Sequence, residues 1–121
     1  MTTSRQELGS WGETLAAEYL TQNGYTVLAH NVRTRHGEID LVARQGAVTV
    51  FIEVKTRSST AYGPPESAIT PTKQTHLLAS AQTYLQTHPE LVGDWRIDVI
   101  AIRRRKGMEP EIVHFENAVG G

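Results

Sequence analysis

The chain of 121 residues contains no cysteine. This absence excludes a disulfide framework and zinc sites built on thiolates, so a bound metal would take oxygen ligands. The histidines are scattered, with no pair at the spacing of a zinc hydrolase, at positions 30, 36, 76, 88 and 114. Internal repeats and a glycine-rich loop of the Walker type are also missing from the sequence. Carboxylate oxygens, which favour magnesium or manganese, are therefore the metal ligands to look for.

Long apolar stretches are absent as well. No run of residues approaches the length that spans a membrane, and the first ten residues, MTTSRQELGS, contain no apolar stretch of the signal-peptide type. We therefore expect a soluble, cytoplasmic protein that does not associate with membranes. The length predicts a single domain, residues 1–121, whose core is formed by a small sheet and a few helices.

The chain also has little net charge, −1 at pH 7, which is a mild argument against nucleic-acid binding. Three of the acidic residues belong to the candidate site described below, and leaving them out turns the net charge to +2. The basic residues are clustered at 33–36, at 55–57 and at 103–106. The last cluster is equally consistent with a solvated hairpin turn ending at Gly107 and with a contact to phosphate.

Two carboxylates and a lysine lie on two neighbouring predicted strands. The segments GEIDLVAR (37–44) and AVTVFIEVKTR (47–57), separated by a short turn signal, form a hairpin pattern rich in β-branched residues. Alternation of side chains places Glu53 and Lys55 on one face of a strand that is apolar on both faces. Burial of these charges is unfavourable unless they bind something. Together with Asp40 they form a candidate site, although a strand end that reaches solvent is the alternative explanation.

The remaining pattern predicts an α/β fold. The predicted elements are helices at about 6–22 and 71–88 and strands at about 25–32, 37–44, 47–57, 96–102 and 111–116. This order describes a central mixed sheet flanked by helices. The segment from Arg57 to Tyr62 is predicted to be a loop, which is either a plain connector or a substrate-binding segment.

Other acidic residues are placed by their spacing. Glu13 falls in a stripe of small and apolar residues on the first helix that includes Gly9 and Gly12. Because small neighbours let a helix approach a sheet closely, we interpret Glu13 as a third carboxylate directed at the metal; a surface residue paired with arginine is the alternative. Glu38 lies two residues before Asp40 and so shares its face of the strand, which makes it a candidate additional acid. Alternatively, it reaches solvent from the end of the strand. We interpret Asp98 as a structural acid paired with a basic side chain.

Basic and polar residues flank the candidate site. Lys73 and Gln74 fall in the first turn of the second helix, where free amides and the helix dipole favour anions. Together with Arg35 and Arg57 they are the candidate contacts to a nucleic-acid backbone. Such contacts provide salt-sensitive affinity without sequence preference.

Asp40 together with Glu53-Val54-Lys55 resembles the core of the PD-(D/E)XK nuclease superfamily, with Ile39 in place of the proline in that name. This resemblance implies a restriction-endonuclease-like core. It also implies hydrolysis of phosphodiester bonds assisted by one or two Mg²⁺ or Mn²⁺ ions. The ligands would be Asp40, Glu53, the Val54 carbonyl oxygen and Glu13. Lys55 would orient the attacking water or neutralise developing charge.

A longer pattern is closer to one family. The segments GEIDLVAR, VFIEVKTR and RIDVI, together with the Gly63-Pro64 turn and Lys73, resemble the YraN-type family of candidate bacterial endonucleases. The fold of that family is similar to that of archaeal Holliday junction resolvases, in which a glutamate on the first helix binds metal. The resemblance covers the chain from about Trp11 to about Ile102. It favours structured or branched DNA as the substrate.

Two other hypotheses stay open. The chain could be a catalytically silent nucleic-acid-binding adaptor of the same fold, or a metal-dependent hydrolase of a small phosphorylated compound. The intact set of two acids and a lysine argues against the adaptor, and basic groups spread along several elements favour a polymer over a small ligand. The sequence leaves open the choice of DNA or RNA, endo- or exonucleolytic cleavage, the number of metal ions and whether the chain forms a homodimer.

Overall fold

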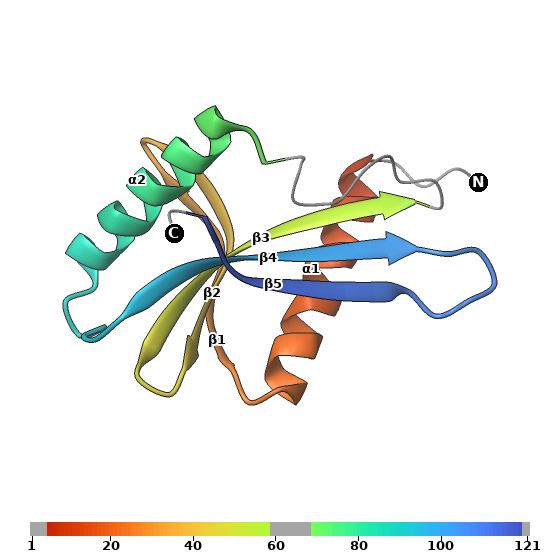
Figure 1. Cartoon of the computed structure of the whole chain (residues 1–121), viewed down its shortest axis with the longest axis horizontal. Helices are drawn as coiled ribbons and strands as arrows, with labels where there is room; N and C mark the ends of the chain where they lie inside the picture. The colour runs from red at the N-terminus through yellow and green to blue at the C-terminus, as the bar shows by residue number, and fades with distance from the viewer. Residues whose placement is uncertain (1–4, 59–68, 120–121) are drawn as a thin grey trace.

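The structure, a computed structural model, describes residues 5–58 and 69–119. The elements are α1 (Arg5–Gln22), β1 (Thr26–Thr34), β2 (Gly37–Gln45), β3 (Val48–Ser58), α2 (Pro71–Thr87), β4 (Trp95–Arg104) and β5 (Glu111–Val119) (Figure 1). The predicted order of helices and strands is confirmed over these residues. Positions 59–62 of the predicted loop and the Gly63-Pro64 turn lie outside them.

The five strands form one mixed sheet in the order β1-β2-β3-β4-β5. Neighbouring strands are antiparallel except for β3 and β4, which are parallel. Parallel neighbours need a crossover connection, and α2 lies in the connection between these two strands. The predicted α/β fold with a central mixed sheet flanked by helices is therefore confirmed, and it is a restriction-endonuclease-like core.

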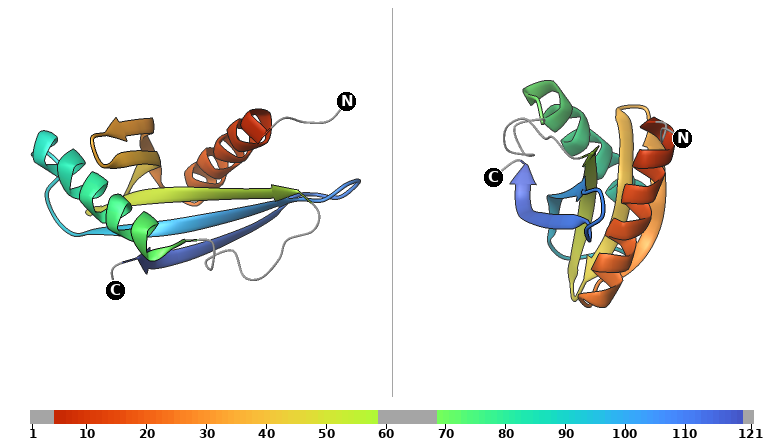
Figure 2. Two further views of the ribbon diagram at one scale, coloured as in Figure 1. Left: turned by 90° about the horizontal axis from the view of Figure 1, so that it is seen from above. Right: turned by 90° about the vertical axis from the view of Figure 1, so that its right-hand side faces the viewer.

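The two helices cover opposite faces of the sheet (Figure 2). One face packs against α1 in a cluster that includes Ile52 and Leu20, and the other packs against α2 in a cluster that includes Phe51 and Leu77. Residues of β3 alternate between these clusters, as the two-residue period of a strand predicts. Because β3 is apolar on both faces, any charged group on it lies between two packed layers.

Local sequence signals explain where the helices start and how closely they approach the sheet. The side chain of Thr70 caps α2 by accepting a hydrogen bond from the Lys73 amide, and Pro71 occupies the first turn. On α1, Gly12 is buried against β3, and a Cβ atom at this position would overlap the Thr56 hydroxyl. The prediction that small residues bring α1 close to the sheet is confirmed at Gly12.

The alternation of β2 is broken at Asp40. Ile39 packs in the α2 cluster, whereas Leu41 packs in the α1 cluster, although residues two apart on a regular strand share a face. Across the hairpin, Asn31 has a left-handed backbone with φ 49°. The pairing of β2 with β3 runs from Gln45 to Leu41, and β2 then continues alongside β1. The two strands that carry the candidate site therefore diverge at Asp40.

Several predicted boundaries need correction. Arg57 is not in a loop, because β3 continues to Ser58 alongside β4. Arg103 and Arg104 belong to β4, so the basic run enters the turn only at Arg105. Pairing with a neighbouring strand extended these ends, which single-strand propensity does not report. Within the described part of the chain, neither helix is both long and apolar enough to cross a bilayer.

Candidate active site

An open depression lies beside the first turns of α1, where β2 leaves β3. Its lining residues are Leu8, Gly9, Glu13, Asp40, Glu53, Val54, Lys55 and Thr56. All four predicted catalytic residues, Glu13, Asp40, Glu53 and Lys55, are among them. The structure thus brings together on one surface side chains that come from a helix and from two diverging strands.

Glu53 is the most deeply buried of these charged residues, with a relative exposure of 5%. Its Oε1 lies 3.8 Å from the Lys55 ammonium and its Oε2 lies 3.5 Å from the Lys73 ammonium. Burial, together with the negative charge of Asp40, raises the pKa of Glu53 to about 7, even though the two lysines oppose the shift. Oε2 is buried and accepts no hydrogen bond from the described residues, since its contact with the Lys73 ammonium, at 3.5 Å, is longer than an ordinary hydrogen bond.

Asp40 is fixed by the backbone of the next strand. Its Oδ2 accepts a hydrogen bond of 2.8 Å from the Val54 amide. Burial raises the pKa of Asp40 despite this hydrogen bond and the positive charge of Lys73. Two neighbouring carboxylates that both resist ionisation are typical of a site that binds a positive charge.

Glu13 reaches the same depression from α1 and is held by a residue that the sequence analysis missed. With its side-chain amide oriented to satisfy its neighbours, Asn31 donates hydrogen bonds to Glu13 Oε1 at 2.9 Å and to Glu38 Oε1 at 3.1 Å. Burial and the charge of Asp40 raise the pKa of Glu13, and the Asn31 hydrogen bond partly offsets them. Asparagine tolerates the left-handed backbone found at this position. The hairpin register, which places Asn31 opposite Asp40, is the signal that could have identified it.

The residues suit a divalent cation at the pair of Asp40 and Glu53. Both offer hard oxygen atoms, both have raised pKa values, and one buried oxygen of Glu53 lacks a hydrogen bond. Among residues 5–58 and 69–119, however, no three Asp, Glu or His side chains are arranged to hold one ion. The fit therefore rests on two carboxylates, and the roles of Glu13 and of the Val54 carbonyl oxygen as ligands stay predictions.

The four predicted nucleic-acid contacts are placed differently from one another. The Lys73 ammonium lies 3.5 Å from Glu53 Oε2, at the site itself. Arg57 lines a small neighbouring pocket together with Lys55. Gln74 donates from its side chain to the Ile69 carbonyl, 3.2 Å away, just before α2. Arg35 lies at the β1–β2 turn, where its Nε contacts the His36 ring. Of these four residues, Lys73 contacts a candidate catalytic residue, and Arg57 lines a pocket together with one.

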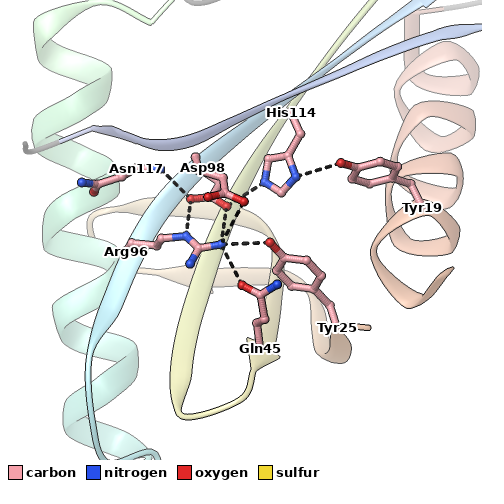
Figure 3. Close-up of polar contacts among 8 residues, drawn as sticks. Tyr19, Tyr25, Gln45, Arg96, Asp98, His114 and Asn117 are labelled. Carbon is pink, nitrogen blue, oxygen red and sulfur yellow. Dashed lines mark hydrogen bonds and ion pairs between the residues drawn. The ribbon is translucent and has the colours of Figure 1, made fainter. Parts of the chain in front are cut away.

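Asp98 has the structural role predicted for it (Figure 3). It is fully buried and accepts hydrogen bonds from Arg96, from His114 Nε2 at 2.7 Å and from the Asn117 amide. Burial alone would raise its pKa, but these donors hold the pKa of Asp98 below its usual value. His114 in turn contacts Tyr19 on α1 at 3.1 Å, which the sequence analysis did not anticipate. This network joins α1 to the last two strands.

A mixed sheet that carries two carboxylates and a lysine where its strands diverge defines a restriction-endonuclease-like α/β protein. The chain belongs to the Uncharacterised protein family UPF0102, whose profile matches residues 12–102, and this confirms the predicted YraN-type membership. A UPF0102 protein of Geobacter metallireducens is 46% identical over 118 residues, which cover 98% of this chain and 96% of the relative. One from Syntrophomonas wolfei is 45% identical over 93% of this chain and 97% of the relative. None of these names states an activity.

Proposed function

We propose that this chain is a metal-dependent nuclease that hydrolyses phosphodiester bonds in nucleic acid, with structured or branched DNA as the favoured substrate. The observation that carries the proposal is the environment of Glu53, a buried carboxylate with a pKa of about 7 and one oxygen that accepts no hydrogen bond from the described residues. The same protein shows what a structural carboxylate looks like. Asp98 is equally buried, but its hydrogen bonds lower its pKa. Glu53 lacks that compensation and is suited to a ligand.

The proposed roles follow from position. Asp40 and Glu53, with the Val54 carbonyl oxygen and Glu13, would hold one or two Mg²⁺ or Mn²⁺ ions. Such an ion, when bound, polarises the scissile phosphate and lowers the pKa of a coordinated water. Lys55, whose ammonium lies 3.8 Å from Glu53, would orient the attacking water or neutralise charge on the phosphate.

Lys73 has a related role at the other oxygen of Glu53. Its ammonium lies 3.5 Å from Oε2, and its backbone amide is engaged by the Thr70 cap at the start of α2. The side chain is 39% exposed, so it can turn toward a phosphate group beside the site. Lys55 and Lys73 therefore balance the two carboxylates and provide positive charge next to the scissile bond.

A cleavage assay tests the proposal. Purified protein is incubated with labelled four-way junctions, flaps, duplexes and single strands of DNA, and with matching RNA, in Mg²⁺, Mn²⁺ or EDTA. We expect product only with a divalent ion, and loss of product in Asp40→Asn, Glu53→Gln and Lys55→Ala. The matched control is Glu18→Gln, which neutralises an exposed glutamate on α1 and should retain activity.

Two measurements separate the enzyme from the adaptor. Calorimetry should show that Asp40→Asn and Glu53→Gln lose magnesium binding, whereas Lys55→Ala retains it. Calcium should tighten the binding of nucleic acid at constant ionic strength, because a bound ion adds positive charge beside carboxylates that otherwise repel the phosphate. Binding that ignores divalent ions, together with no product in Mn²⁺ from any substrate, would establish the adaptor instead.

A further inference from the structure

The side-chain amide of Asn31 is shared between two acids that come from different elements. It donates one hydrogen bond to Glu13 Oε1 on α1, at 2.9 Å, and a second to Glu38 Oε1 on β2, at 3.1 Å. A side-chain amide has two N–H donors, so both donors of Asn31 are used on carboxylates. Asn31 therefore connects α1 to the β1–β2 hairpin beside the depression that Glu13 lines.

The backbone of β1 changes its course at Asn31, where φ is 49°. Ala29 and Val32 both pack in the α2 cluster, although residues three apart on a regular strand lie on opposite faces. Non-glycine residues adopt a positive φ only rarely, and asparagine is one of the few that tolerate it. Residues held in such conformations cluster at functional sites. Here the conformation accompanies a side chain that reaches toward α1, where Glu13 lies.

Glu13 lies beside the pair of Asp40 and Glu53 and does not converge with them on one point. The three side chains line one depression, but among the residues that the structure describes no three acids or histidines are arranged to hold one ion. A glutamate side chain that faces an open depression has several rotamers to choose from. The hydrogen bond from Asn31 restricts that choice through Oε1 and leaves Oε2 of Glu13 for a ligand.

We infer that Asn31 is a positioning residue of the candidate metal site, which holds the Glu13 carboxylate where it adds to the binding of an ion. The inference rests on the proposed function, since it presupposes an ion at Asp40 and Glu53, and it adds a residue that acts through Glu13 without touching the ion. Glu38 has a supporting role, because by accepting the second N–H it fixes which way the amide faces. Loss of a hydrogen bond that orients a metal-binding side chain typically weakens metal binding by about 10- to 100-fold.

Calorimetric titration of metal-free protein with Mn²⁺ tests this role. Asn31→Gly supplies a residue that accepts the left-handed backbone but removes the amide, and it should weaken Mn²⁺ binding by about tenfold. In protein that already carries Glu13→Ala, the same substitution should have no further effect, because the group through which Asn31 acts is gone.

Asn117→Gly is the matched control. Asn117 has nearly the same left-handed backbone, with φ 51°, and it contacts Asp98 through its backbone amide, which glycine retains (Figure 3). This variant therefore makes the same change of residue at the same backbone conformation, away from the depression, and its affinity for Mn²⁺ should equal that of the unchanged protein.

Each outcome has a definite meaning. The inference is overturned if Asn31→Gly binds Mn²⁺ as tightly as Asn117→Gly, if its loss of affinity persists in the Glu13→Ala background, or if Glu13→Ala alone changes nothing. Circular dichroism verifies that the variants are folded, and the Glu13→Ala result stands whether or not Asn31→Gly folds. Loss of Mn²⁺ binding in Asp40→Asn but not in Asn31→Gly keeps the proposed nuclease and removes this role. Coupling of Asn31 to Glu13 without cleavage of any substrate does the reverse, and failure to bind Mn²⁺ removes both.

Discussion

The side chain of Asp40 accepts a hydrogen bond of 2.8 Å from the backbone amide of Val54. Through this bond a carboxylate on β2 still contacts β3 beyond Leu41, where the regular pairing of the two strands ends. This hydrogen bond fixes the carboxylate beside Glu53 and also satisfies an amide that would otherwise face the opening between the strands. One residue therefore has a structural task and a proposed catalytic one. The two tasks can be separated by substitution.

Asp40→Asn and Asp40→Ala should differ in stability but not in activity. Asparagine retains an oxygen that can accept the Val54 hydrogen bond and removes a charge that raises the pKa of Glu53, so Asp40→Asn should be at least as stable as the unchanged protein at pH 8. Asp40→Ala leaves the amide without this acceptor and should lose about 1–3 kcal/mol. Urea denaturation measures both. Equal stability of the two variants would show that the hydrogen bond contributes nothing.

The pKa of Glu53 predicts an unusual dependence of stability on pH in metal-free protein. The native state holds a proton up to about pH 7, whereas the unfolded glutamate releases it near 4.5. Between these values the native state binds more protons, so the free energy of unfolding should fall as pH rises, by up to about 3 kcal/mol. Urea denaturation in EDTA at several pH values measures this fall.

Glu53→Gln provides the comparison for this pH dependence. Because glutamine does not titrate, most of the decline between pH 4.5 and 7 should disappear, leaving the part that the raised pKa values of Asp40 and Glu13 contribute in the same direction. Glu18→Gln, on the exposed face of α1, should keep the full decline. A decline that persists undiminished in Glu53→Gln would assign the titration to another group.

Gly12→Ala should disturb both stability and the proposed site. A Cβ atom at Gly12 would overlap the Thr56 hydroxyl and lie 3.0 Å from Thr56 Cβ, so α1 must move away from β3 and carry Glu13 with it. We expect a loss of about 1–3 kcal/mol in thermal or urea denaturation, with reduced cleavage. Gly9→Ala is the matched control, since a methyl group there meets nothing within 4 Å and should stabilise the helix by about 0.5–1 kcal/mol. Indistinguishable behaviour of the two variants would exclude close packing at Gly12 as the reason for glycine.

Asp98 should support stability only while it is ionised. Its pKa is lowered in the folded state, so its contribution is complete above the ordinary aspartate pKa of about 3.9 and is lost as pH falls through the folded value. Asp98→Asn leaves the partly buried Arg96 without its buried counter-charge and should cost about 3 kcal/mol at pH 7. The exposed Asp94→Asn should change stability little. Denaturation curves at pH 7 and below pH 4 measure both effects, and a stable Asp98→Asn would show that the network is dispensable.

The sequence predicted the order of the helices and strands and the proximity of Asp40, Glu53 and Lys55, whereas it predicted some strand ends and the partners of these side chains less well. Glu53 and Lys55 could be placed because strand alternation and a turn signal are local properties. The end of β4 was missed because pairing with β3 extends it to Arg104. Gln74 was predicted from its place in the first turn of α2, and only the structure shows its side chain donating to Ile69.

The sequence by itself determined the order of helices and strands, the two-sided burial of β3 and the presence of Asp40, Glu53 and Lys55 on adjacent strands, because these follow from short-range periodicity. The tertiary structure decided which distant groups meet them. Lys73 approaches Glu53, Asn31 holds Glu13, and His114 joins Asp98 to Tyr19. These contacts depend on how α1 and α2 pack on the sheet and on the separation of β2 from β3 at Asp40. The pKa of Glu53 depends on the same packing, since burial is its largest cause and burial exists only once the layers have assembled.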